Sequence, residues 1–143
     1  MTRLISSGSP WEAELGYSRA VVSGGFVFVS GSSGLVRGGA DAGTAAEQLT
    51  VAIGKIEAAL AEAGCTLADV VSTRVYLTDE ADWEEVGRAH GSVFRDIRPA
   101  LSMVQVARLI DPLMKIEIEA VAVATAMPVV SAVSATRTEG DRA

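Results

Sequence analysis

The carboxylates of greatest chemical interest lie in an alternating stretch near the end of the chain. Between Met114 and Ala120, the charged side chains of Lys115, Glu117 and Glu119 occupy the odd positions and apolar side chains occupy the even ones. This period of two predicts a β-strand whose charged residues share one face. A glutamate that is partly removed from water has a raised pKa, and it can then act as a general acid or base when water attacks a C=N bond.

Two interpretations of this charged face are open. In the first, the face is a solvent-exposed polar stripe on which Lys115 balances Glu117 and Glu119. In the second, the face is buried between subunits, where a carboxylate is costly unless it is paired or used. Only the second interpretation makes Glu117 a candidate catalytic residue.

Residues that other mechanisms need are missing from the sequence. His90 has no cysteine, aspartate or glutamate at metal-ligand spacing, so we expect a structural histidine that is exposed or half-buried. The segment Gly31–Gly34 lacks the pattern of a phosphate-binding loop, and no Gly-x-Ser-x-Gly nucleophile motif occurs. Cys65 has no basic neighbour that would activate a thiol, which predicts a packing residue. We therefore expect neither a metal nor a cofactor.

Composition and charge argue against two classes of partner. The 143 residues contain 12 Lys and Arg against 18 Asp and Glu, a net charge of −6, whereas nucleic-acid binding needs cations that neutralise phosphates. No apolar run reaches the ~18 residues of a membrane-spanning helix, and the first residues lack the apolar core of a signal peptide. A single cysteine cannot form an intrachain disulfide, which suits a reducing compartment. We expect a cytoplasmic protein that binds neither nucleic acid nor membrane.

The elements that must position these residues follow the order strands, helix, strand, helix, strands. Residues 44–64 have the apolar spacing of an amphipathic helix, and Thr44 with Glu47 forms a capping box at its start. A second helix follows the capping residue Asp79 and ends before Pro99. Runs of β-branched or alternating residues predict strands at 18–22, 26–30, 69–77 and in the two halves of 98–123. Ser23-Gly24-Gly25 predicts a hairpin-like turn between the first two of these strands.

These elements predict one domain over residues 1–124 and a flexible C-terminal tail over residues 125–143. Two amphipathic helices can cover only one face of such a sheet. Several strands are nevertheless apolar on both faces, because Phe26 and Phe28 oppose valines in the same strand. The uncovered face would be a large exposed apolar surface, and copies of the same chain cover it most simply. We therefore predict a homo-oligomer.

Short landmark motifs are spread over residues 16–123. In chain order they are Gly16-Tyr17-Ser18-Arg19-Ala20, Val27-Phe28-Val29-Ser30-Gly31, Ala63-Gly64, Asp69-Val70-Val71, Tyr76-Leu77-Thr78-Asp79, Arg98-Pro99-Ala100, Val106-Ala107-Arg108-Leu109 and Ile116-Glu117-Ile118-Glu119-Ala120. Through the ordered co-occurrence of these motifs, the chain resembles the Rid/YjgF family of small trimeric enamine and imine deaminases. The resemblance implies an α+β, chorismate-mutase-like fold in which a mixed sheet of about six strands carries two helices on one face. It also implies a homotrimer with clefts between its subunits.

The resemblance further implies which residues line those clefts. In deaminating members an arginine grips the substrate carboxylate, and a glutamate helps a water molecule to hydrolyse the imine to a ketone and ammonia. Glu117 and Tyr17 stand at matching positions and are the candidate catalytic residues. The candidate substrate-binding residues are Ser30, Gly31, Leu101 and Met103.

Leu101 stands where deaminating members carry the arginine. Leucine cannot form the bidentate, charge-assisted pair that a guanidinium makes with a carboxylate. Simple 2-imino acids are therefore expected to bind poorly, and Leu101 with Met103 favours a neutral or larger ligand. Whether Arg19 or Arg74 replaces the missing cation is open at this point.

Two functions of different classes follow. The first is a Rid-like enzyme that hydrolyses or rearranges an imine, an enamine or a related carbonyl compound in clefts between subunits. The second is a non-catalytic, ligand-binding or structural trimer in which Tyr17 and Glu117 serve only interface hydrogen bonding. An endoribonuclease activity, a label sometimes attached to the family, is disfavoured by the acidic charge.

Overall fold

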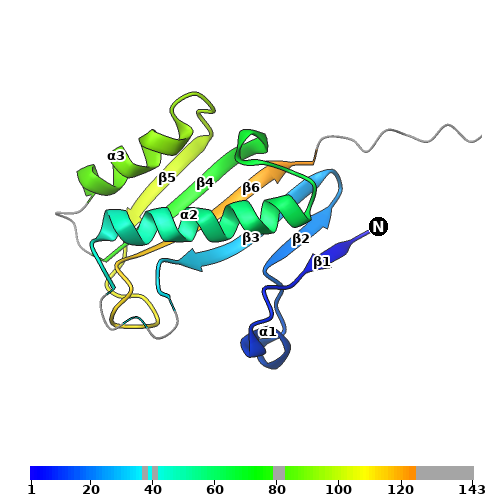
Figure 1. The fold of residues 1–143 in the computed structure, drawn as a ribbon, viewed down its shortest axis with the longest axis horizontal. Coiled ribbons are helices and arrows are strands. Elements are labelled where there is room, and N and C mark those ends of the chain that lie inside the picture. Colours follow the sequence, from blue (N-terminus) through cyan, green and yellow to red (C-terminus); the bar gives the residue numbers. More distant parts are fainter. Residues whose placement is uncertain (37–38, 40–41, 79–82, 125–143) are drawn as a thin grey trace, which may run out of the picture.

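One mixed sheet organises the molecule, for which a computed structural model describes residues 1–36, 39, 42–78 and 83–124. Its six strands lie in the order β1-β2-β3-β6-β4-β5 (Figure 1). All neighbours pair antiparallel except β4 and β5, which are parallel. The strands are β1 (Arg3–Ile5), β2 (Ala20–Ser23), β3 (Phe26–Ser33), β4 (Val70–Leu77), β5 (Ala100–Gln105) and β6 (Ile116–Val123).

Two long helices cover one face of this sheet. The helices α2 (Ala45–Glu62) and α3 (Trp83–Phe94) lie over the sheet on the same side (Figure 1). The short helix α1 (Pro10–Leu15) lies apart from them, beyond the β1–β2 end of the sheet. A single 3₁₀ turn, Leu67–Asp69, leads into β4. The predicted α+β fold, with a mixed six-stranded sheet and two helices on one face, is confirmed.

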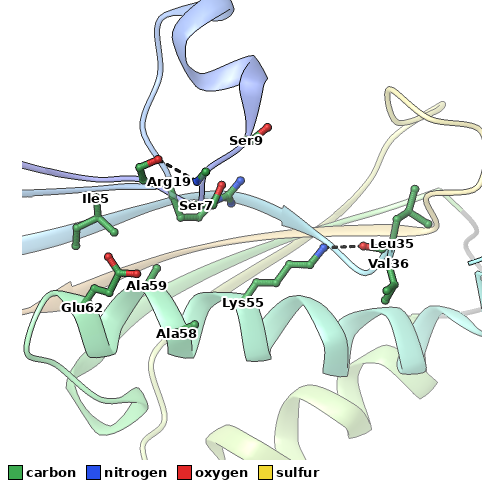
Figure 2. A pocket seen from close by; sticks show the side chains of 12 residues that line it. Ile5, Ser7, Ser9, Arg19, Leu35, Val36, Lys55, Ala58, Ala59 and Glu62 are labelled. Carbon is green, nitrogen blue, oxygen red and sulfur yellow. Dashed lines mark hydrogen bonds between the residues drawn. The ribbon is translucent and has the colours of Figure 1, made fainter. Parts of the chain in front are cut away.

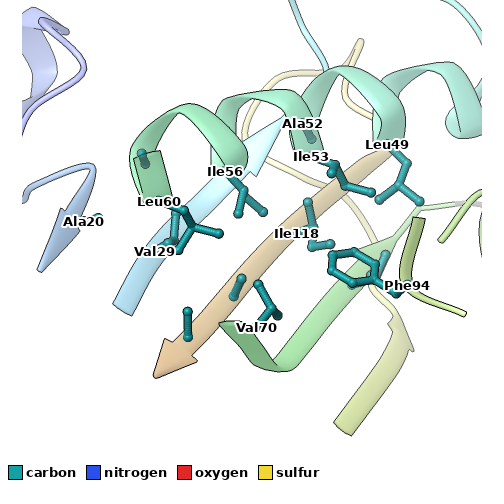
Figure 3. Packing of buried hydrophobic residues seen from close by; sticks show 14 of the residues in the cluster. Ala20, Val29, Leu49, Ala52, Ile53, Ile56, Leu60, Val70, Phe94 and Ile118 are labelled. Carbon is teal, nitrogen blue, oxygen red and sulfur yellow. The ribbon is translucent and has the colours of Figure 1, made fainter. Parts of the chain in front are cut away.

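The core forms between α2 and the even-numbered side chains of β6. Ile116, Ile118, Ala120 and Ala122 are all buried, and the charged residues alternate with them as predicted. Figure 3 shows the facing side chains of α2, which include Leu49, Ala52, Ile53, Ile56 and Leu60. The helix starts where the sequence predicts, because the Thr44 hydroxyl accepts from Glu47 N and the Glu47 carboxylate accepts from Thr44 N.

Two residues that carry a sulfur or nitrogen atom, Cys65 and His90, are buried in the core. Cys65 is buried, as expected for a packing residue. His90 was expected to be exposed or half-buried, and that expectation is wrong, because only 6% of it is exposed. Its Nε2 lies 2.9 Å from the hydroxyl of Thr73 on β4, so the ring is buried with a hydrogen-bond partner. Burial lowers the pKa of His90, which favours the neutral ring.

The predicted hairpin between β2 and β3 is present, and β3 is irregular beyond it. Gly24 and Gly25 both have positive φ angles, 59° and 81°, as a tight hairpin turn requires. Further along, Val29 pairs with Ala120, but the next pair is Ser32 with Ile118. The two residues between them form a β-bulge opposite β6, and a bulge can redirect backbone groups and side chains at a site.

The face without helices divides into an apolar half and a polar half. The apolar half carries partly exposed side chains from β1, β3 and β6: Leu4, Phe26, Phe28 and Val123. The polar half carries Arg74, Tyr76, Glu117 and Glu119, which alternate with buried residues on β4 and β6. We call the whole surface the open face.

Some expectations fall outside what the structure describes. The predicted capping residue Asp79 and the predicted tail over residues 125–143 lie outside the described residues. Within the described part of the chain, no helix has the length and apolar character to cross a membrane.

Candidate functional site

The bulge in β3 brings Gly31 against the carboxylate of Glu117. A Cβ atom on residue 31 would overlap Oε1 of Glu117, so only glycine leaves room for the carboxylate in this position. The neighbouring Ser30 is tied to the chain before β2. Its hydroxyl donates to Ser18 O at 2.7 Å, and its N–H donates to Arg19 O at 3.0 Å. The bulge is therefore held in one conformation.

Glu117 lies on β6 between Ser33 of β3 and Tyr76 of β4. It is half-buried, and this burial raises the pKa of its carboxyl group above the ordinary value for glutamate. The negative charge of Glu119 raises this pKa further, whereas the positive charge of Arg19 acts in the opposite direction. Such a carboxylate holds a proton more readily than an exposed one, which suits it to general acid–base chemistry.

Tyr17 is placed by the end of α1. The helix ends at Gly16, which adopts the left-handed conformation with φ 72°, and Tyr17 N donates to Glu12 O. The backbone of Tyr17 is thus one residue away from the carbonyl that Ser30 binds, and its side chain is 37% exposed. Four of the six candidate residues, Tyr17, Ser30, Gly31 and Glu117, therefore belong to segments that meet at the bulge.

The other two candidate residues lie elsewhere in the chain. Leu101 pairs with Thr73 and Met103 pairs with Val75 in the parallel β4–β5 ladder, so their side chains share the helix-covered face with these buried residues. Glu117 belongs to the opposite face and lies two strands away, which is roughly 10 Å. Leu101 is 45% exposed on the edge strand, and Met103 packs against the core. A single chain does not bring Leu101 and Met103 to Glu117.

The two arginines considered as substitutes have other partners. Nη1 of Arg19 donates to Ser30 O, Gly31 O and the Ser32 hydroxyl at 3.3, 3.0 and 2.9 Å. These hydrogen bonds stabilise the bulge. Arg74 on the open face forms an ion pair with Glu119 at 3.0 Å.

A hollow of about 510 Å³ lies beside Glu117 on the open face. Its wall includes Tyr76 of β4 and three residues from the connection between β5 and β6, Arg108, Leu109 and Ile110. Ile110 is 99% exposed. Neither Tyr76 nor Arg108 was predicted from the sequence as a site residue. Strand alternation on β4 could have identified Tyr76, but no pattern places a loop residue such as Arg108.

Metal ligands do not gather in this part of the molecule. Among residues 1–36, 39, 42–78 and 83–124, no three His, Cys, Asp or Glu side chains lie together as a metal site requires. The chemical groups at the bulge are the Glu117 carboxylate, the Arg19 guanidinium, nearby hydroxyls and backbone amides. These groups can hold and activate a water molecule.

Known proteins of similar sequence and structure match most of the length of this chain. Residues 8–124 match the family model described as Endoribonuclease L-PSP. A solved structure from Mycobacterium tuberculosis, described as a member of the YjgF/YER057c/UK114 family, is 46% identical with a TM-score of 0.78, and the match covers 86% of this chain and 99% of that one. A protein of Streptomyces coelicolor is 38% identical over 124 residues, which are 82% of this chain and 90% of that protein. The human protein named 2-iminobutanoate/2-iminopropanoate deaminase is 34% identical over 123 residues, which are 85% of this chain and 89% of the human one.

Proposed function

The chain belongs to the Rid/YjgF family, and from this premise we propose that it hydrolyses or rearranges an imine, an enamine or a related carbonyl compound in clefts between the subunits of a homotrimer. The observation that carries the proposal is the half-buried Glu117 carboxylate, which lies directly over Gly31 beside an open hollow. The name of the human relative indicates imine chemistry in a protein of similar sequence. The single cysteine supports a reducing compartment such as the cytoplasm.

In the proposed mechanism Glu117 acts as general base towards a water molecule. The imine reacts in its protonated form: the water oxygen forms a bond to the carbon of the C=N group, one water proton passes to Glu117, and the π electron pair moves to nitrogen. The resulting carbinolamine takes that proton from Glu117 on nitrogen. Its C–N bond then breaks with the electron pair leaving on the amine or ammonia, while the hydroxyl group gives its proton to Glu117 and becomes the carbonyl group. Tyr17 is the proposed second catalytic residue, which orients the reacting nitrogen, and Ser30 with Gly31 shapes the cleft floor.

The substrate is expected to lack a simple carboxylate anchor. Leu101 offers no charge, Arg19 does not line the Glu117 hollow, and Arg74 is paired with Glu119. A neutral or larger imine fits the apolar contribution of Leu101 and Met103. Simple 2-imino acids are expected to be poor substrates for the same reason.

A complete cleft requires more than one subunit. Glu117 and Leu101 lie on opposite faces of one sheet, so a cleft that contains both must combine two chains. The apolar half of the open face supplies a surface for that contact, since Phe26 and Phe28 are 42% and 48% exposed. These observations support the trimer.

The assembly is tested by placing a charge on this surface. Phe28→Asp is expected to convert the trimer to monomers at micromolar concentration, because the interface would have to bury an unpaired carboxylate. Val51→Asp on α2 is the matched control, since Val51 is also exposed (37%) but lies on the helical side. Sedimentation velocity measures both. A wild-type protein that sediments as a stable monomer would contradict the trimer.

The activity is tested with two classes of substrate that are generated in solution. Neutral imines, formed from an amine and an aldehyde or ketone, should be hydrolysed faster in the presence of the protein, whereas 2-iminopropanoate should be hydrolysed negligibly. Release of amine or ammonia per trimer is the measurement. If no imine, enamine or carbonyl substrate is turned over, the alternative of a ligand-binding or structural trimer is favoured instead.

A further inference from the structure

We propose that the chain has a second site, separate from the Glu117 hollow, which binds a small molecule through a carboxylate or phosphate group. The site is a cavity of about 670 Å³ between α2, the end of β3 and the connection from β1 to α1. Its lining includes Arg19, which immediately precedes β2, and Lys55 of α2, whose ammonium group points towards Leu35 in Figure 2. A cavity of this volume suits a metabolite-sized ligand.

Two partly buried cations, Arg19 and Lys55, line this cavity and make it positively charged at that side. Nζ of Lys55 donates to Ser33 O and Leu35 O at 2.7 and 2.8 Å, which leaves one of the three ammonium donors for a ligand. All three hydrogen bonds from Arg19 to the bulge come from Nη1, so Nε and Nη2 take no part in holding the bulge. Both side chains are held rigidly by backbone carbonyls, which is how a preformed anion site would be built.

The two cations lack a matching carboxylate at ion-pair distance. In the described part of the chain, the ion pairs are Arg74 with Glu119 and Arg88 with Glu84. The nearby carboxylate of Glu12 instead accepts hydrogen bonds from Ser6 and Ser7. Burial first, and the charge of Arg19 second, lower the pKa of Lys55. A bound anion would offset both effects, because it supplies the missing negative charge.

The rest of the lining defines how a ligand would lie. Glu62 is seven residues after Lys55, about 10 Å further along the helix, and Figure 2 shows it at the other end of the cavity beside Ala59. The anionic group therefore belongs at the Lys55 end. A short apolar body would lie over Ala58 and Ala59 of α2. Ser9 adds a hydroxyl that makes no capping bond to α1.

The cavity is independent of the proposed catalytic site. None of Tyr17, Ser30, Gly31 and Glu117 lines it, and the Glu117 hollow shares no lining residue with it. Arg19 links the two regions, because it lines the cavity and also bonds to the bulge. Failure of the proposed imine chemistry would leave this inference intact.

Isothermal titration calorimetry with inorganic phosphate and with butanoate tests the site. We expect saturable binding of at least one probe, with one ligand per chain. Lys55→Met, which keeps the length of the stem, should weaken it by about 10–100-fold. Lys115→Met is the matched control and should bind like the wild type, because Lys115 is an exposed lysine whose Nζ also donates to a backbone carbonyl.

A second pair of variants leaves both cations in place. Lys55 holds two carbonyls at the end of β3, so its loss could alter the fold, whereas Ala58 is exposed and only lines the cavity. Ala58→Glu should abolish binding by charge repulsion, and Ala58→Gln, which has the same size without the charge, should retain it within a few fold. Binding of one probe alone would assign phosphate or carboxylate as the preferred group. Absence of saturable binding by the wild type, or wild-type affinity in Ala58→Glu, would overturn the proposal.

Discussion

Replacing Glu117 by glutamine is expected to lower the turnover rate per trimer by about 10²–10⁴-fold, the usual cost of losing a general base. Glutamine keeps the size of the side chain and part of its hydrogen bonding over Gly31, so the assembly should survive. The rate and the oligomeric state are to be measured on the same sample. If Glu117 only supports the interface, the trimer should weaken instead and activity should fall in proportion to trimer content. An unchanged rate per trimer would remove Glu117 from the mechanism.

The pH dependence of kcat/KM tests the role of Glu117 independently, and Glu119 on the same strand provides the matched variant. Because the pKa of Glu117 is raised, the acidic limb of kcat/KM should lie above the pH at which an ordinary glutamate titrates. Glu119→Gln removes a negative charge that raises this pKa, so the limb should move to lower pH while turnover at its plateau persists. A limb that stays in place would show that another group controls the reaction.

The same raised pKa has a consequence for stability. Glu117 binds its proton more tightly in the folded chain than in the unfolded chain. Its contribution to the free energy of unfolding is therefore present below the pKa of unfolded glutamate, and it is lost as the pH rises through the higher folded value.

Leu101→Arg is expected to raise kcat/KM for 2-iminopropanoate by about 10–100-fold, which is the value of a charge-assisted hydrogen bond to a carboxylate. The position is accessible, since Leu101 is 45% exposed on the edge strand β5. In the proposed trimer, its guanidinium is expected to face the Glu117 region of a neighbouring subunit. The assay is ammonia release from 2-iminopropanoate at several concentrations, so that kcat and KM are separated.

Leu101→Gln serves as the control for this gain. It introduces hydrogen-bonding groups of intermediate size without a charge, so it should leave turnover of 2-iminopropanoate close to that of the wild type. A wild-type rate comparable to that of a homologue with arginine at this position would contradict the proposed role of Leu101. Arg108, which lines the Glu117 hollow, would then become the candidate carboxylate anchor.

Local patterns predicted most of the fold. The hairpin at Gly24 and Gly25, the capping box of Thr44 and the alternation of β6 all follow from short-range backbone geometry, and the structure contains them. Three short elements were missed: β1, α1 and the 3₁₀ turn Leu67–Asp69. They have three, six and three residues, and segments this short hold too few repeats for a period to be detected.

The sequence by itself determined which residues alternate along each strand, because side-chain direction in a strand depends only on neighbouring positions. Only the tertiary structure decided which side of the sheet each set faces, because that depends on the register between strands distant in sequence. The pairing of β4 with β5 assigns Leu101 and Met103 to the helical side. The bulge in β3 brings Gly31 against Glu117, a contact between residues far apart in the chain. No pattern within either strand contains that information, so the division of the candidate site between the two faces of the sheet became visible only in three dimensions.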